Sequence, residues 1–254
     1  QRFSGHGFKS TNLGVTWTEW GDALDYTSLV FAAGDSLLLA GTYGQGIRYS
    51  TDGATTWSAM NAGIPDDAQV PILTDGRNGW MYACVNINGA VKLYRLHRNA
   101  MEWSRADNGI DTTKNINGCA VMPDGTVFAI VWDRIYRSLD DGATWTQTAI
   151  LNDYLQSVCA ISNTTLLVGT VSAGTYRSTD GGNTWGSFND GLTTLNITAI
   201  RPGGMTFSAG KPGSLFRRSF SAPRPKPVLA FPLNNAPAVP RPSVLSWTND
   251  GAAT

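Results

Sequence analysis

The sequence has little histidine, cysteine or glutamate, the residues that most often carry metal binding and acid–base chemistry. It contains two histidines, and its glutamates are Glu19 and Glu102. Two isolated histidines supply neither a metal-binding pair nor a Ser-His-Asp set. Three cysteines occur without a Cys-x-x-Cys pair, so they indicate neither zinc nor a disulfide framework. We therefore predict no catalytic residue, no bound metal and no cofactor.

An excess of either charge and long apolar runs are also missing. Lys and Arg total 19, Asp and Glu total 19, and the net charge is zero. Without basic excess to neutralise phosphates, nucleic acid is not an expected partner. No apolar run reaches membrane-spanning length, so we expect no direct membrane insertion. No signal peptide is recognisable, and we interpret the chain as a mature form or a fragment.

What the sequence does contain is a repeat. Four stretches, 10–17, 50–57, 138–145 and 178–185, are nearly alike, and we call them the tryptophan turns. Their shared positions are Ser10, Asn12, Gly14, Trp17, Ser50, Asp52, Trp57, Ser138, Asp140, Gly142, Trp145, Ser178, Asp180, Gly182 and Trp185. A degenerate copy at 96–103 retains only the tryptophan, Trp103. A period of roughly forty residues is typical of stacked or radially arranged modules.

The chemistry of these positions predicts tight turns between strands. Ser and Asp side chains accept hydrogen bonds from nearby backbone N–H groups. Glycine permits the positive φ that such a turn needs, and tryptophan supplies a large face for burial. The pattern Ser-x-Asp-x-Gly-x-Thr-Trp resembles the Asp-box, or BNR repeat, over residues 1 to about 220. The resemblance implies that these residues are structural and join the third and fourth strands of propeller blades, away from the ligand-binding face.

We predict an all-β Asp-box β-propeller of about six four-stranded blades, with five or seven as alternatives. The first complete unit has strand-like stretches at 29–32, 37–42, 46–50 and 56–59, each bounded by turn residues. Further units begin near Val70, Ile116 and Gln156, with an incomplete one near Ile197. Matching cysteines, Cys119 and Cys159, should lie on inner strands as small apolar residues, and a bond between them stays open.

Composition divides the chain into three parts. Residues 1–221 carry the propeller, and 222–227 form a Pro-rich linker that reads as extended and semi-rigid. Residues 228–254 look like the beginning of a fibronectin type III-like domain, a β-sandwich that this length leaves truncated. We therefore expect the chain to be part of a longer multidomain protein.

One face of the propeller is the expected working surface. In the family's topology, the turns between second and third strands and the links between blades share that face. These segments mix acidic and aromatic residues, and we nominate Tyr43, Trp132, Asp133, Arg134 and Tyr154 as binding residues. An ordinary solvated loop rim is the competing interpretation.

We predict a secreted or cell-surface, non-catalytic module that binds a protein or a glycan or serves structural assembly. One alternative is a glycoside hydrolase that uses loop-face carboxylates, similar to the Asp-box endoglucanases. Another is an assembly or accessory subunit of a larger complex, similar to Asp-box propellers that help build photosystems. Whether the chain is an enzyme stays open, and the missing catalytic set favours a protein that is not. A sialidase is not expected, because the Arg-Ile-Pro element and a tyrosine–glutamate pair are not recognisable.

Overall fold

The computed structural model describes residues 8–10, 12, 15–19, 24, 27–32, 37–76, 79–100, 102–201, 206–210 and 214–218. The chain divides into two compact units, Gln1–Ser219 and Phe220–Thr254, and every described residue belongs to the first. Gly14, the linker 222–227 and the fibronectin-like segment 228–254 lie outside the described residues. Within the described part, no helix is long and apolar enough to cross a membrane.

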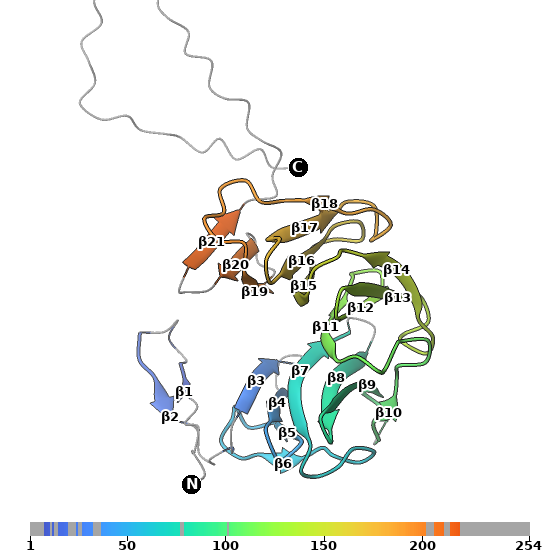
Figure 1. The fold of residues 1–254 in the computed structure, drawn as a ribbon. Coiled ribbons are helices and arrows are strands. Elements are labelled where there is room, and N and C mark those ends of the chain that lie inside the picture. The colour runs from blue at the N-terminus through green and yellow to red at the C-terminus, as the bar shows by residue number, and fades with distance from the viewer. Residues whose placement is uncertain are drawn as a thin grey trace, which may run out of the picture. The chain divides into compact units, whose positions relative to one another are not determined.

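The regular elements of this unit are β-strands, which group into antiparallel sheets in chain order (Figure 1). We name each sheet by its first strand. Four sheets have four strands: β3 (Thr27–Ala32), β4 (Leu38–Thr42), β5 (Ile47–Ser50) and β6 (Ser58–Ala59); β7 (Gln69–Asp75), β8 (Trp80–Ile87), β9 (Ala90–His97) and β10 (Ser104–Arg105); β11 (Ile116–Val121), β12 (Val127–Val131), β13 (Arg134–Ser138) and β14 (Thr146–Ile150); β15 (Leu155–Ala160), β16 (Leu166–Thr170), β17 (Thr175–Ser178) and β18 (Gly186–Ser187).

Two shorter sheets flank them. The first pairs β1 (Phe8–Lys9) with β2 (Thr18–Glu19), and the last contains β19 (Ile197–Arg201), β20 (Thr206–Gly210) and β21 (Ser214–Arg218). The prediction of an all-β chain built from four-stranded antiparallel units is confirmed, including where the units begin. The number of blades in the complete ring stays a prediction.

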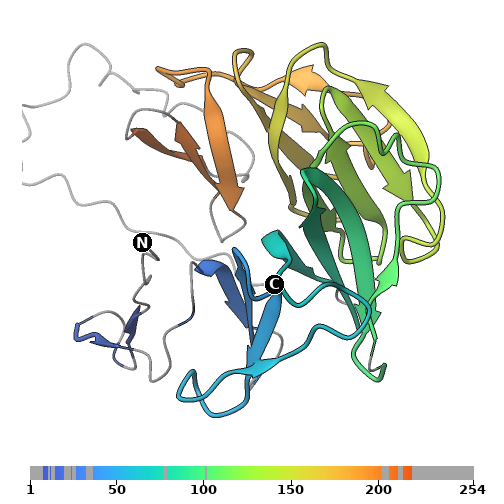
Figure 2. The same cartoon turned by 60° about the horizontal axis from the view of Figure 1, so that its bottom comes forward.

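The first strands of consecutive sheets contact one another: β3 meets β7, β7 meets β11, β11 meets β15 and β15 meets β19. Figure 2 shows the same succession from another side. Sheets that share an inner row of first strands are arranged around an axis, which defines a propeller. Strand β12 is buried along its whole length, as expected for a strand with a neighbouring sheet on each face.

The hydrophobic core lies between neighbouring sheets. Tyr82 and Leu93 of the β7 sheet pack with Val127, Tyr136 and Trp145 of the β11 sheet in one continuous cluster. Similar clusters join the β3 sheet to the β7 sheet and the β11 sheet to the β15 sheet. Each sheet therefore depends on its neighbours for burial of its two faces.

The cysteines belong to this core. Cys119 lies on β11 and Cys159 on β15, both first strands, and these two and Cys84 are free and buried. The prediction that Cys119 and Cys159 are small apolar residues on inner strands is confirmed, and no disulfide joins the two. Burial raises the pKa of the Cys84 thiol to about 12, so this thiol stays protonated at neutral pH.

Two tryptophans, Trp103 and Trp145, fasten their sheet to the one before it, whereas Trp185 Nε1 donates to the Gly182 oxygen within its own turn. Trp145 Nε1 donates to the backbone oxygen of Ala106 over 2.7 Å, and the Trp145 backbone N–H donates to the oxygen of Asn108. Trp103 makes the same bond to Met60. Gly109 completes the junction, because a Cβ at this position would lie 2.4 Å from the Trp145 oxygen. Trp103 and Trp145 therefore take part in the packing between sheets.

Trp17 departs from this arrangement. Its side chain is 61% exposed, whereas those of Trp103 and Trp145 are 2% and 6% exposed. The expectation of a buried face is wrong for this residue. Trp17 precedes β2 in the two-stranded sheet, and its exposure separates it from the buried tryptophans of the later turns.

Within the tryptophan turns, the aspartate organises the backbone. Asp140 Oδ1 accepts from the Thr144 N–H over 2.9 Å, and Oδ2 accepts from the Thr144 hydroxyl over 2.6 Å. The Ser138 hydroxyl donates to Asp140 and accepts from the Gly142 N–H. The Thr144 hydroxyl and N–H, followed by the Ser138 hydroxyl, lower the pKa of Asp140 to about 2. Asp52 and Asp180 make corresponding bonds.

Basic residues on the third strands hold the turns of the following sheet. Arg95 donates to the backbone oxygen of Asp141 over 2.6 Å, and Arg137 donates to Asn183 Oδ1 over 3.0 Å. Lys9, on β1 of the two-stranded sheet, likewise donates to the oxygen of Gly53 in the following sheet. These cations therefore point to several different turns and do not converge on one pocket.

Candidate binding face

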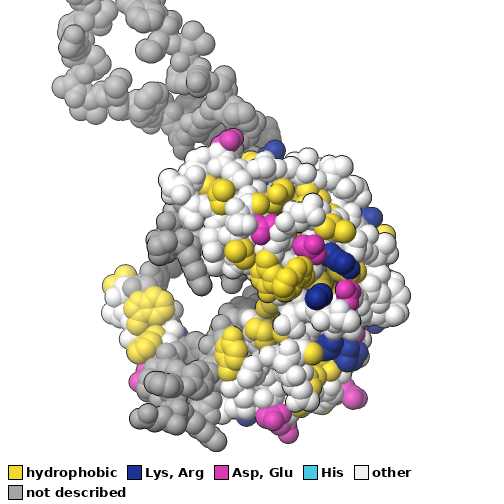
Figure 3. Space-filling view, viewed as in Figure 1, with side chains coloured by type: hydrophobic (Ala, Val, Ile, Leu, Met, Phe, Trp, Pro, Cys, Tyr) yellow, Lys and Arg dark blue, Asp and Glu magenta, His cyan; other side chains and the backbone are white. Residues whose placement is uncertain are grey.

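One side of the unit carries the turns between second and third strands together with the links between sheets, and we call it the loop face. Backbone bonds fasten the links to the turns: Leu155 N–H donates to the Trp132 oxygen, and Val171 N–H donates to the Tyr154 oxygen. The loop face comprises the turns 43–46, 88–89, 132–133 and 171–174 and the links 60–68, 106–115, 151–154 and 188–196. Figure 3 shows hydrophobic side chains gathered beside charged side chains of both signs on one side of the molecule.

An aromatic pair stands on this face at the junction of the β11 and β15 sheets. The rings of Trp132 and Tyr154 meet edge-to-face with centroids 5.1 Å apart. Trp132 occupies the tight β12–β13 turn with φ of 56° and is 50% exposed. The Tyr154 hydroxyl donates to Asn117 Oδ1 over 3.1 Å, and Lys114 Nζ lies 5.4 Å from the centre of the Trp132 ring. The pair is therefore fixed in place and half open to solvent, and we call it the aromatic ledge.

Charged groups flank the ledge in neutralising pairs. Arg134 Nη1 lies 3.5 Å from Asp111 Oδ2, and Arg134 Nε lies 3.6 Å from Asp133 Oδ1. The Thr113 hydroxyl and N–H lower the pKa of Asp111 by donating hydrogen bonds to it. Such exposed pairs add little to stability, and they leave the charges beside Trp132 largely balanced.

Asp153 joins the 151–154 link to the next turn. Its Oδ2 accepts from the backbone N–H groups of Ser172 and Ala173 over 2.9 and 2.7 Å. Partial burial raises the pKa of Asp153, but the bonds from Ser172, Thr170 and Ala173 outweigh burial and the net shift is downward. A general acid needs a raised pKa, so the shifts at Asp111 and Asp153 suit structural acceptors and not proton donors.

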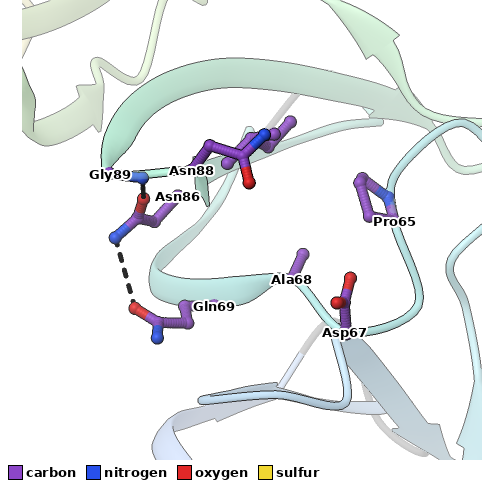
Figure 4. A pocket seen from close by; sticks show the side chains of 8 residues that line it. Pro65, Asp67, Ala68, Gln69, Asn86, Asn88 and Gly89 are labelled. Atoms are coloured by element: carbon purple, nitrogen blue, oxygen red, sulfur yellow. Dashed lines mark hydrogen bonds between the residues drawn. The ribbon is translucent and has the colours of Figure 1, made fainter.

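The fifth nominated residue lies elsewhere on the face. Tyr43, 48% exposed, follows β4 and pairs with Gln69 through an isolated antiparallel bridge. Next to it is an open hollow of ≈ 480 Å³ lined by Pro65, Asp67, Ala68, Gln69, Asn86, Ile87, Asn88 and Gly89 (Figure 4), which we call the amide hollow. The structure thus brings Trp132, Asp133, Arg134 and Tyr154 together and puts Tyr43 at the edge of a second surface.

Some residues of these two surfaces could not be predicted from the sequence. No sequence pattern pointed to Asn117 or Gln69, which hold Tyr154 and Asn86 through side-chain bonds. Each is one polar residue at the beginning of a first strand, and nothing but the fold places it beside its partner. Across the described ranges, no group of three or more His, Cys, Asp or Glu residues is arranged to hold a metal ion.

Comparisons with known proteins agree on the fold. The family model of the DUF6242 beta propeller domain matches residues 72–198, half of the chain. No curated protein matches the sequence.

Solved structures of several kinds share the fold. One described as YCF48 bound to D1 peptide superposes with a TM-score of 0.68 at 18% identity, covering 85% of this chain and 73% of that one. The extracellular domain of the putative hybrid two component system BT3049 from B. thetaiotaomicron gives 0.60 at 14% identity, covering 79% and 28%. The GH74 xyloglucanase from Xanthomonas campestris gives 0.57 at 14% identity, covering 80% and 39%. Because these proteins differ in what they do, the similarity shows the propeller fold only. The function has to be argued from the residues of the site.

Proposed function

We propose that this chain, which belongs to the DUF6242 beta propeller domain family, is a non-catalytic binding module whose loop face captures a segment of a partner protein. The observation that carries the proposal is the aromatic ledge, in which a half-exposed Trp132 is held by Tyr154 and stands beside Lys114. Rigid, partly exposed tryptophan and tyrosine side chains are the residues that most often dominate binding energy at protein interfaces.

Preorganisation supports this assignment. The ledge is fixed by the Tyr154–Asn117 bond and by the Leu155–Trp132 backbone bond, so a partner does not have to order it. Val171 and Leu195, 38% and 44% exposed, supply further apolar surface on the same face. The solved protein described as YCF48 bound to D1 peptide is a propeller that binds a peptide, which is consistent with this use of the fold.

Selection from a display library of random peptides tests the proposal without a known partner. We expect peptides enriched on the wild-type protein to bind the Trp132→Ala variant about 10- to 100-fold more weakly, because loss of an aromatic anchor typically costs about 2 kcal/mol or more. Trp17→Ala is the matched control, since Trp17 is a comparably exposed tryptophan in a tryptophan turn, and its binding should equal that of the wild type.

The proposal fails if no peptide is enriched, or if enriched peptides bind both variants equally well. It also fails if the purified protein cleaves a polysaccharide such as xyloglucan and the Asp133→Asn variant does not, since the loop-face carboxylates would then be catalytic.

The proposal also covers the repeat type, the number of blades, the neighbouring domain and the location of the protein. The tryptophan turns are taken to be of the Asp-box type, in a propeller of about six blades that is joined to a fibronectin type III-like domain in a longer protein. The protein is taken to be secreted or held at the cell surface. Protease treatment of intact cells of the native source should digest it there; complete protection by the intact cell envelope would contradict this location.

A further inference from the structure

The amide hollow lies at the junction of the β3 and β7 sheets and shares no residue with the aromatic ledge. We infer that it is a binding site for a neutral saccharide. This activity goes beyond peptide capture and stands on separate residues, so either proposal can fail alone.

The chemistry of the lining supports a ligand rich in hydroxyl groups. Figure 4 shows the Asn88 and Asp67 side chains turned toward the open space of the hollow, with Pro65 and Ala68 as its apolar wall. Asn88, Asp67 and Gln69 are exposed lining residues, so their polar groups are accessible to a ligand. Amides both donate and accept, and a carboxylate accepts. Together they complement hydroxyl groups, each of which donates one hydrogen bond and accepts others.

The hollow is also rigid. Asn86 Nδ2 donates to Gln69 Oε1 over 3.2 Å, and Asn86 Oδ1 accepts from the Gly89 N–H over 2.9 Å. On the opposite side, the Ala68 oxygen accepts from the N–H groups of Gly44 and Gly46. These bonds link β7 to both flanking turns, so the lining groups keep their spacing when no ligand is bound.

An aromatic residue outside the lining, Tyr43, is paired with one lining residue, Gln69. Tyr43 pairs directly with Gln69 across an antiparallel bridge, and side chains opposite each other in such a pair project to the same side. The half-exposed Tyr43 ring therefore lies on the same side as the Gln69 amide and offers a flat apolar surface next to the polar groups.

Charge decides which saccharides fit. Asp67 is the ionisable residue of the lining, and its carboxylate repels phosphates, uronic acids and sialic acids. The hollow is open, which suits part of an extended chain better than an enclosed small molecule. The expected ligands are therefore neutral oligosaccharides.

The test is an NMR titration of the whole chain with cellotetraose, xylotetraose, mannotetraose and galactotetraose, each raised to millimolar concentration. We expect at least one to shift the backbone amide signals of Ala68 and Gly89. Asn88→Gly removes the side chain while suiting the φ of 52° at this position, and it should weaken that binding about tenfold, as should Asp67→Ala. Asn152→Gly is the matched control, because Asn152 is an exposed asparagine with φ of 54° in a different link.

Unchanged binding in both hollow variants, no shift with any of the four sugars, or tighter binding of an acidic oligosaccharide would overturn the inference. So would binding of a lysine-containing peptide in the hollow, displaced by no sugar. Trp132→Ala should leave saccharide binding intact, which separates failure of this inference from failure of the proposed peptide site.

Discussion

At the scale of single residues, one turn of the chain shows what the aspartate charge adds. In the first tryptophan turn, Asn12 stands where the later turns have aspartate, and its Oδ1 still accepts from the Thr16 N–H over 2.8 Å. Its Nδ2 meets the Thr16 hydroxyl over 2.8 Å. An amide therefore fits the turn, but it donates to the Thr16 hydroxyl, whereas Asp140 accepts from the Thr144 hydroxyl and also carries a charge.

In Asp140→Asn, the part of the stability effect that depends on pH reports on the charge, because the asparagine does not titrate. Because the pKa of Asp140 is lowered to about 2 in the folded protein, its ionised form stabilises the fold fully above the unfolded pKa of about 4. This contribution is lost as the pH falls toward 2. Asp140→Asn should therefore lower the melting temperature at pH 7, and the gap from wild type should shrink between pH 4.5 and 2.

Thermal unfolding followed by circular dichroism across that pH range measures the gap. Asp124→Asn is a control, because Asp124 lies in another turn and binds only the Thr126 N–H in the described structure. A gap for Asp140→Asn that stays constant with pH would show that the charge contributes nothing.

At the scale of elements, the sequence predicted strands well because each strand carries its own signal. Turn residues bound every predicted stretch, and β4, β5 and β6 of the first complete unit begin within one or two residues of the predicted starts. The inter-sheet contacts were harder to foresee. The bond from Arg137 to Asn183 joins residues that are neighbours only once two sheets pack together.

The tryptophans provide a measurement of these inter-sheet contacts. Trp145→Ala removes a buried ring and its bond to Ala106 and should lower the free energy of unfolding by about 3–5 kcal/mol. Trp17→Ala, at the exposed copy of the same position, should change it by about 0.5 kcal/mol or less. Urea unfolding compares the two variants directly. Equal losses would mean that position in the repeat, and not packing against the preceding sheet, sets the role of the tryptophan.

At the scale of the whole propeller unit, neighbouring sheets share their cores, so they should unfold together. The buried thiols of Cys84, Cys119 and Cys159 lie in three consecutive sheets and report on each separately. We expect a thiol reagent to modify none of them in the native protein and all three at one urea midpoint. Mass spectrometry of the labelled peptides identifies each site. Modification of one cysteine at a clearly lower urea concentration would show that its sheet opens independently.

The sequence predicted only some of the features of the loop face. The nomination of Trp132 and Tyr154 followed from their places in a turn and a link that the repeat puts on one side. Their edge-to-face contact depends on the junction of the β11 and β15 sheets, which no local pattern encodes. The same reason explains why Tyr43 belongs with Gln69 and Asn86 and not with Trp132.

The central claim is that the repeated turns are structural and that binding takes place on the loop face. Amide hydrogen exchange, measured with and without a peptide enriched on the wild-type protein, tests it most directly. The account predicts slower exchange in 111–117, 132–134 and 151–155, with no change in 50–57, 138–145 and 178–185. Protection of the tryptophan turns with none around Trp132 would contradict it.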